Sequence, residues 1–224
     1  MRKWVLIPYF PLLLISTILI FVTHVSAASC ARQDIKDLLE ASRGELQFNG
    51  AYFPSPKAVF FSSIKDGREI QWIGAKWDGP VDGALFAQDC AGNNISVLRL
   101  GGVIILKSGP VLPTGKTVEV AYISGVGSGI YETTSAIASI EGSSIKILWQ
   151  HASIHREAFG KGYDYVDTFQ WKYSRDGKKI NVKGRRRVGP TMEYEHGWPA
   201  GTTHALPSQN YCWNAQENLF QECD

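Results

Sequence analysis

The segment YDYVDTFQWKYSRDGKKINVKGRRRV, Tyr163 to Val188, holds the clearest pattern in the chain. Aromatic rings and one acid stand at every second position of its first half: Tyr163, Tyr165, Asp167, Phe169, Trp171 and Tyr173. Side chains of a β-strand alternate between the two faces of a sheet, so these residues are expected to share one face. The Asp-Gly pair that follows is a strong hairpin signal between two β-rich runs. We predict an antiparallel hairpin whose aromatic face is buried in the core.

The same alternation recurs from Lys57 onward. The runs AVFFSSI and EIQWIG flank KDGR, YETTSAIASI and SIKILW flank EGS, and TVEVAYI and YETTSAIASI flank GVGSG. Glycine supplies the positive φ that tight hairpin turns require. Successive hairpins with little helix between them predict a mainly β protein, with antiparallel strands forming a hairpin-rich sandwich, barrel or meander.

One helix is expected before the strands. The stretch RQDIKDLLEASRGEL, from Arg32 to Leu46, has apolar residues at helical spacing and acids in its early turns, and Gly44 can end it. We therefore predict one short N-terminal helix.

The chain begins with MRK, followed by an apolar run from Trp4 to Val22 that two prolines interrupt. The uninterrupted part, which starts at Leu12, is too short to span a bilayer of about 30 Å and is typical of a signal peptide. Val25 and Ala27 supply the small side chains of a cleavage site. We predict a signal peptide over residues 1–27, cleavage near Ala27, and a secreted or periplasmic mature protein.

Two alternatives for this terminus remain open. The residues AASC, Ala27 to Cys30, loosely match the motif at which bacteria attach lipid to a cysteine. If the prolines are tolerated, the whole apolar run would stay as an N-terminal anchor. Membrane contact is expected only through such an uncleaved or lipidated terminus.

Arg2 and Lys3 account for the formal net charge of +2, so the chain without its signal peptide is neutral. A neutral domain has no overall field that would attract DNA, RNA or an anionic membrane. We therefore exclude nucleic acid as a partner. The partners that fit an exported β protein are an envelope glycan or an envelope protein.

Four cysteines, Cys30, Cys90, Cys212 and Cys223, are an even number in an exported chain and predict two disulfides. Cys212 and Cys223 enclose a short loop in a turn-rich segment, so we pair them, and pair Cys30 with Cys90 by default. The sequence leaves all three connectivities open. Zinc would require close pairs such as C-x-x-C, which this chain lacks.

These observations divide the chain into four parts. The signal peptide is followed by the helix and its lead-in over residues 28–56, and then by the antiparallel β domain over residues 57–188. From Gly189 onward the sequence contains prolines and acids but no lysine or arginine. Residues 189–224 are expected to form an irregular tail with a disulfide loop.

The hairpin also offers a candidate ligand-binding surface. Trp171 is a side chain that stacks on sugar rings. The consecutive arginines Arg185, Arg186 and Arg187 would bind an anionic polymer or a lipid head group of the envelope. In the competing interpretation the rings belong to the core, and the acids of the tail lie across the basic strand in weak, exposed ion pairs.

Five residues are weak candidates for catalysis: Asp164, Asp167, Glu193, Glu195 and His196. A glycosidase needs two carboxyl groups about 5–10 Å apart across a cleft. Asp164 and Asp167, however, are expected on opposite faces of their strand. No serine stands in the G-x-S-x-G pattern of a nucleophile elbow, and oxidised cysteines are not nucleophiles.

No cofactor or metal site is predicted. The stretch GVGSGIYE, from Gly125, departs from the dinucleotide-binding spacing G-x-G-x-x-G and precedes a strand, so it favours a hairpin loop. His151 and His155 are close enough in sequence to share a face, but a metal site usually needs a third ligand. We interpret both as surface or loop histidines.

We therefore predict an exported, non-catalytic β domain that acts as a binding or structural component of the cell envelope or extracellular space. The basis is the export signal together with the lack of a convincing catalytic arrangement. The alternative is a secreted or periplasmic hydrolase acting on envelope carbohydrate, and whether the chain is an enzyme stays open.

Overall fold

The computed structural model describes residues 35–42, 57–65, 67–77, 79, 81–90, 93–158, 162–190, 193–195 and 198–223. Over these residues the protein consists of antiparallel strands and one helix, α1 (Ile35–Ala41), which confirms the predicted fold class. The helix lies inside the predicted stretch Arg32–Leu46, and the rest of that stretch falls outside the described residues except for a turn at Ser42. The predicted signal peptide also lies outside them.

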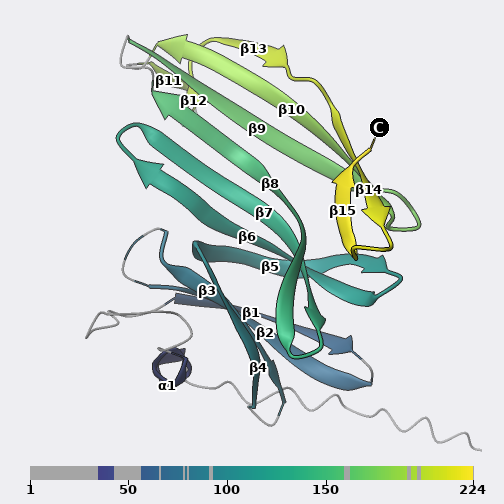
Figure 1. The fold of residues 1–224 in the computed structure, drawn as a ribbon. Coiled ribbons are helices and arrows are strands. Elements are labelled where there is room, and N and C mark those ends of the chain that lie inside the picture. The colour runs from purple at the N-terminus through teal and green to yellow at the C-terminus, as the bar shows by residue number, and fades with distance from the viewer. Residues whose placement is uncertain are drawn as a thin grey trace, which may run out of the picture.

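Two large sheets make up the molecule, and in each the strands follow one another mostly in chain order (Figure 1). The first sheet contains β1 (Lys57–Lys65), β2 (Arg68–Lys76), β3 (Gly83–Asp89) and β4 (Asn94–Leu100). The second contains β5 (Gly102–Leu112), β6 (Gly115–Gly127), β7 (Ile130–Glu141), β8 (Ser144–Ala158), β9 (Tyr163–Tyr173), β10 (Lys179–Pro190), β13 (Thr202–Ala205), β14 (Gln209–Asn214) and β15 (Leu219–Glu222). A small third sheet pairs β11 (Tyr194–Glu195) with β12 (Trp198–Pro199).

The hairpin turns fall where the Asp-Gly and Glu-Gly pairs stand in the sequence. Gly67, Gly142 and Gly177 have φ of 74°, 61° and 72°, in the left-handed region that side chains with a Cβ rarely adopt. They join β1 to β2, β7 to β8, and β9 to β10. The GVGSG stretch joins β6 to β7, as predicted.

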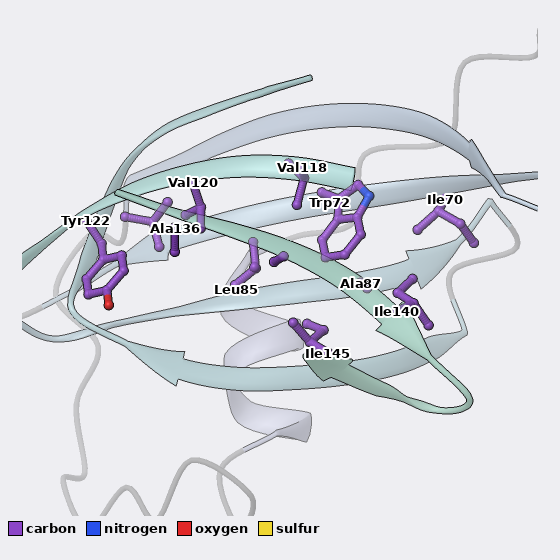
Figure 2. Packing of buried hydrophobic residues seen from close by; sticks show 12 residues of the cluster. Ile70, Trp72, Leu85, Ala87, Val118, Val120, Tyr122, Ala136, Ile140 and Ile145 are labelled. Carbon is purple, nitrogen blue, oxygen red and sulfur yellow. The ribbon is translucent and has the colours of Figure 1, made fainter. Parts of the chain in front are cut away.

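The main core lies between the first sheet and the first half of the second sheet. Figure 2 shows Trp72 and Leu85 near Val118, Val120 and Ala136, which come from β6 and β7. These residues are almost fully buried, and burial of a large apolar side chain contributes about 1.5–3 kcal/mol. Through this face-to-face packing, the first sheet and the first strands of the second sheet form a β-sandwich.

The other face of the first sheet is covered by α1. Leu38 and Leu39 pack against Ile73, Trp77 and Phe86, in a second buried cluster. Because β2 and β3 are covered on both sides, their sequences are apolar at consecutive positions rather than strictly alternating. The helix, the first sheet and the second sheet are thus three successive layers (Figure 1).

The second sheet bends so that its later strands leave the sandwich. The register between β7 and β8 shifts at Thr133/Thr134 and again at Ile137/Ala138, and such bulges bend strands and increase their twist. Ile137 and Ala138 point to opposite faces of the sheet. Ala138 belongs to the main core, whereas Ile137 belongs to a third cluster with Trp149 of β8 and residues of β9, β10, β14 and β15.

The decisive hairpin, β9–β10, forms in the predicted place, and most of its aromatic row packs inward. Tyr165 is only 8% exposed, while Phe169, Trp171 and Tyr173 are half-buried against the third cluster. Tyr163 is the exception at 56% exposed, because it starts the strand and pairs with Pro190 at the end of the sheet.

The C-terminal segment differs from the irregular tail expected from its composition. β10 continues to Pro190, and β13 and β14 then pair with β10 along its outer edge. The N–H and C=O groups of that edge need partners, and the returning chain supplies them. Short strands with a proline between them carry little sequence signal, which is why composition alone indicated a loop.

Cys212 and Cys223 form a disulfide, which confirms that predicted pair. Cys90 is also disulfide-bonded, while its predicted partner, Cys30, lies outside the described residues. The one described helix is too short to cross a membrane. The disulfides are consistent with an extracellular location, because disulfides persist in oxidising compartments.

Candidate functional site

The two predicted acids of β9 are each held in an ion pair. The Asp164 side chain is fully buried, and its Oδ2 accepts a hydrogen bond of 2.9 Å from Nη2 of Arg156. Asp167, also buried, accepts two bonds of 2.7 Å from Nε and Nη2 of Arg186. Asp164 and Asp167 are three positions apart on β9, so their side chains point to opposite faces of the strand and each has a different arginine partner. A carboxylate neutralised in this way is a structural group rather than a free acid or base.

The other three catalytic candidates are described only in part. Glu193 is exposed, and its backbone joins the turn that leads into β11. Glu195 belongs to β11, but its side chain is not among those the structure describes, and His196 lies outside the described residues. The acid that neutralises Arg186 comes from β9, whereas one interpretation of the sequence expected acids of the tail to pair with this basic strand.

The three consecutive arginines of β10 do not act as one cluster. Arg186 pairs with Asp167 and stacks over the Tyr165 ring at 4.3 Å, and the hydrogen bonds that it donates to Asp167 raise the pKa of its guanidinium. Arg185 and Arg187 point to the opposite face because strand side chains alternate. Arg185 is exposed there, whereas Nε of Arg187 is buried.

The two histidines also have separate surroundings. His151 contacts Oε1 of Gln209 at 2.7 Å and packs edge-on against Phe169. His155 contacts Oε2 of Glu132 at 2.9 Å through Nδ1, and the Tyr165 hydroxyl at 3.1 Å through Nε2. Over the part of the chain that the structure describes, no three histidine, cysteine or acidic side chains are arranged to hold a metal ion.

His155 belongs to a polar row that crosses four strands. Glu132, His155, Asp167 and Arg186 stand directly opposite one another on β7, β8, β9 and β10. Opposite charges on facing positions of neighbouring strands stabilise a sheet. This row connects β7, β8, β9 and β10.

The Tyr165 hydroxyl extends this row to Glu157. It donates a hydrogen bond of 2.6 Å to Oε2 of Glu157. Burial is the main cause that raises the pKa of Tyr165 to about 12, and the hydrogen bond to the Glu157 carboxylate is the next. The acids of this cluster therefore have partners within the protein, which indicates a structural role.

A groove beside the aromatic row is a better candidate for ligand binding. It is open, has a volume of about 520 Å³, and is lined by Phe169 and Trp171 together with polar side chains of β5, β9 and β10: Lys107, Gln170, Lys172, Asn181 and Lys183. Trp171, which the sequence singled out, thus lies at this surface while also contacting Trp149 in the third cluster.

Two further grooves continue this one along β9 and β10. One of about 370 Å³ shares Gln170 and Lys183 with it and includes Arg185. Another of about 570 Å³ shares Lys172 and Asn181 with it and includes Lys179. We call the three together the β9–β10 track. Five basic residues and no acidic ones line it, although residues 28–224 carry no formal net charge.

A buried chain of hydrogen bonds fixes two members of the central groove. Nε1 of Trp171 donates to the Tyr173 hydroxyl at 3.1 Å, and this hydroxyl donates to Oε2 of Glu119 at 2.6 Å. Oε1 of Glu119 accepts from Nζ of Lys107 at 2.8 Å. The Glu119 side chain is only 6% exposed. Burial, followed by the bond to Glu119, raises the pKa of Tyr173, so the phenol stays a donor. Trp171 and Lys107 are therefore held in place together.

Sequence reasoning missed most of the track. The alternation that placed the rings on one face also places Gln170 and Lys172 on the other, and Lys183 and Arg185 follow the same rule on β10. That signal was available. Lys107 carried none, because only the coiling of the sheet brings β5 and β6 next to β9, which is shown by the Tyr173–Glu119 bond.

Comparison of the chain with protein-family models, with curated proteins and with solved structures found no match.

Proposed function

We propose that this protein is an exported, non-catalytic binding module, and that the β9–β10 track binds an anionic polymer of the cell envelope or extracellular space. The observation that carries this proposal is the charge of the track: five basic residues line three connected grooves and no acid does, and of the five Lys107 is paired with Glu119 behind the groove. Such a groove concentrates positive potential in a molecule that has no overall field.

The shape of the track also favours a polymer over a small anion. Neighbouring grooves share two residues each, so the basic side chains follow one another along the strands. Lys172, Lys183 and Arg185 are exposed and extend from regular strands, which are more rigid than loops. An extended ligand with repeated negative charges would contact several of them at once.

Export rests on the N-terminal segment and on the cysteines. The proposal includes removal of a signal peptide near Ala27 and placement of the mature protein in the periplasm or outside the cell. The Cys212–Cys223 disulfide supports an oxidising compartment. Intact-mass measurement of the mature protein would distinguish cleavage from lipidation of Cys30 and from a retained anchor.

A hydrolase is supported less well by the same geometry. Asp164 and Asp167 are buried in ion pairs, and none of the three grooves of the track is lined by an acid. Retaining and inverting glycosidases alike need two carboxyl groups facing the sugar.

The test is binding of the purified mature protein to heparin, with neutral dextran as the uncharged comparison. We expect binding to heparin alone, and a logarithmic dependence on salt whose slope falls by roughly one for each cation removed. The double variant Lys172→Gln/Lys183→Gln should bind at least about tenfold more weakly. The matched control is Lys57→Gln/Lys116→Gln, which removes two exposed lysines outside the track and should leave binding unchanged. Equal losses in both double variants would mean that binding depends on total charge, and the proposal would be rejected.

A further inference from the structure

The central groove combines charge with aromatic surface, and this combination bears on the kind of polymer. Lysines alone would serve any polyanion, including a linear polyphosphate. Phe169 and Trp171, however, also line the groove. An aromatic ring gains contact area and dispersion from a flat apolar surface, such as one face of a sugar ring.

The amide side chains add a third requirement. Gln170 is exposed at the groove, and Asn181, which lines it as well, donates from Nδ2 to Oδ1 of Asn210 at 2.8 Å. Amides carry both donors and acceptors, which suits hydroxyl groups that do the same. A polyphosphate chain offers acceptors only, so it cannot donate a hydrogen bond to an amide oxygen in the groove.

The buried hydrogen-bond chain makes ring and charge one unit. Glu119 holds Lys107 directly and holds Trp171 through Tyr173. Because both side chains are fixed before a ligand arrives, less side-chain entropy is lost on binding. A ligand that offers a ring face and an anion at adjoining positions gains from both contacts.

Resting on the proposed function, we infer that the β9–β10 track recognises an anionic polysaccharide, with a pyranose ring against Trp171 and its carboxylate or sulfate group near Lys107, the lysine that Glu119 holds on the same side as the ring. The ligand class is defined by that pair of features. A polyphosphate, which has the charge without the ring, is the competing ligand.

The experiment compares three probes under one salt concentration: polygalacturonate, heparin and long-chain polyphosphate. The variants are Trp171→Leu, which removes the ring, and Gln170→Ala, which changes an exposed side chain and leaves the core intact. Circular dichroism and the urea midpoint show whether each variant is folded. Lys172→Gln/Lys183→Gln serves as the variant that lowers charge only.

We expect polygalacturonate or heparin to bind at least about tenfold more tightly than polyphosphate at equal charge. Loss of the Trp171 ring should weaken polysaccharide binding roughly 2- to 10-fold and leave polyphosphate binding unchanged. Gln170→Ala should act in the same direction, which keeps the test valid if Trp171→Leu does not fold.

The outcomes separate this inference from the proposed function. If polyphosphate binds as tightly as the polysaccharides, and only the lysine variant weakens binding, the inference is overturned while the proposed function stands. If no anionic polymer binds better than dextran, both are overturned. If heparin binds and polygalacturonate does not, the anion is a sulfate, and the ring contact is retained as the basis of recognition.

Discussion

Removing Arg186 is expected to destabilise the protein more than removing Asp167, although the two residues form one ion pair. The Asp167 side chain is 7% exposed and that of Arg186 is 41% exposed. Arg186→Met therefore leaves a buried carboxylate without its partner, which costs about 3–5 kcal/mol. It also removes the stacking over Tyr165, worth about 0.5–1 kcal/mol.

Asp167→Asn has a smaller expected cost. The guanidinium it leaves behind is partly exposed and can turn toward water, so the loss is limited to the charged hydrogen bonds. We expect about 1.5–3 kcal/mol for this variant. The asymmetry between the two variants follows mainly from the difference in burial, and the lost stacking over Tyr165 adds to it.

The measurement is urea unfolding of both single variants and of the double variant, with disulfides intact. The double variant buries no unpaired charge, so its cost should fall short of the sum of the single costs by more than about 1 kcal/mol. Arg185→Met is the matched control, because it removes an exposed arginine from the neighbouring position and should change stability by no more than about 0.5 kcal/mol. Equal costs for the two single variants, or an additive double variant, would refute this reasoning.

Three further predictions concern stability. Replacing Cys212 and Cys223 together by alanine opens a loop with a sequence separation of 11, and should lower the free energy of unfolding by about 3 kcal/mol in urea titrations. Gly142→Ala meets open space and should cost about 1–2 kcal/mol for its positive φ, whereas Gly177→Ala should cost more, because its Cβ would come within 2.5 Å of a backbone oxygen; equal shifts in melting temperature would contradict this. Tyr165 has a pKa of about 12 when folded and about 10 when unfolded, so between these values the unfolded state binds fewer protons and stability falls as pH rises. Tyr165→Phe should therefore lose less stability than the parent protein between pH 10 and 12, and identical pH profiles would rule out this assignment.

The sequence predicted those features of the structure that depend only on neighbouring residues. The turns at Gly67, Gly142 and Gly177 follow from the φ that only glycine adopts easily. The aromatic row of β9 follows from the alternation of strand side chains, and its burial is confirmed for Tyr165 and in part for Trp171. The Cys212–Cys223 pair follows from a short enclosed loop.

Features that depend on segments far apart in the sequence could not be predicted from short patterns. The bulges of β7 and β8 bend the second sheet, and no residue type in those strands marks a bulge reliably. The C-terminal strands form because β10 has an edge to be covered, which is a property of the assembled sheet.

By itself, the sequence determined that this protein is built from antiparallel hairpins, where they turn, and which faces of the strands carry rings or charges. These properties repeat over two to four residues and are set by backbone geometry. The tertiary structure alone decided which charges are used up in ion pairs and which line a groove. Arg186 and Arg185 are neighbours in the sequence, yet one is paired with Asp167 and the other is exposed on the β9–β10 track. Lys107 joins that track only because the sheet coils until residues of β5 and β9 line the same groove. Such contacts depend on the path of the whole chain, so no short sequence pattern predicts them.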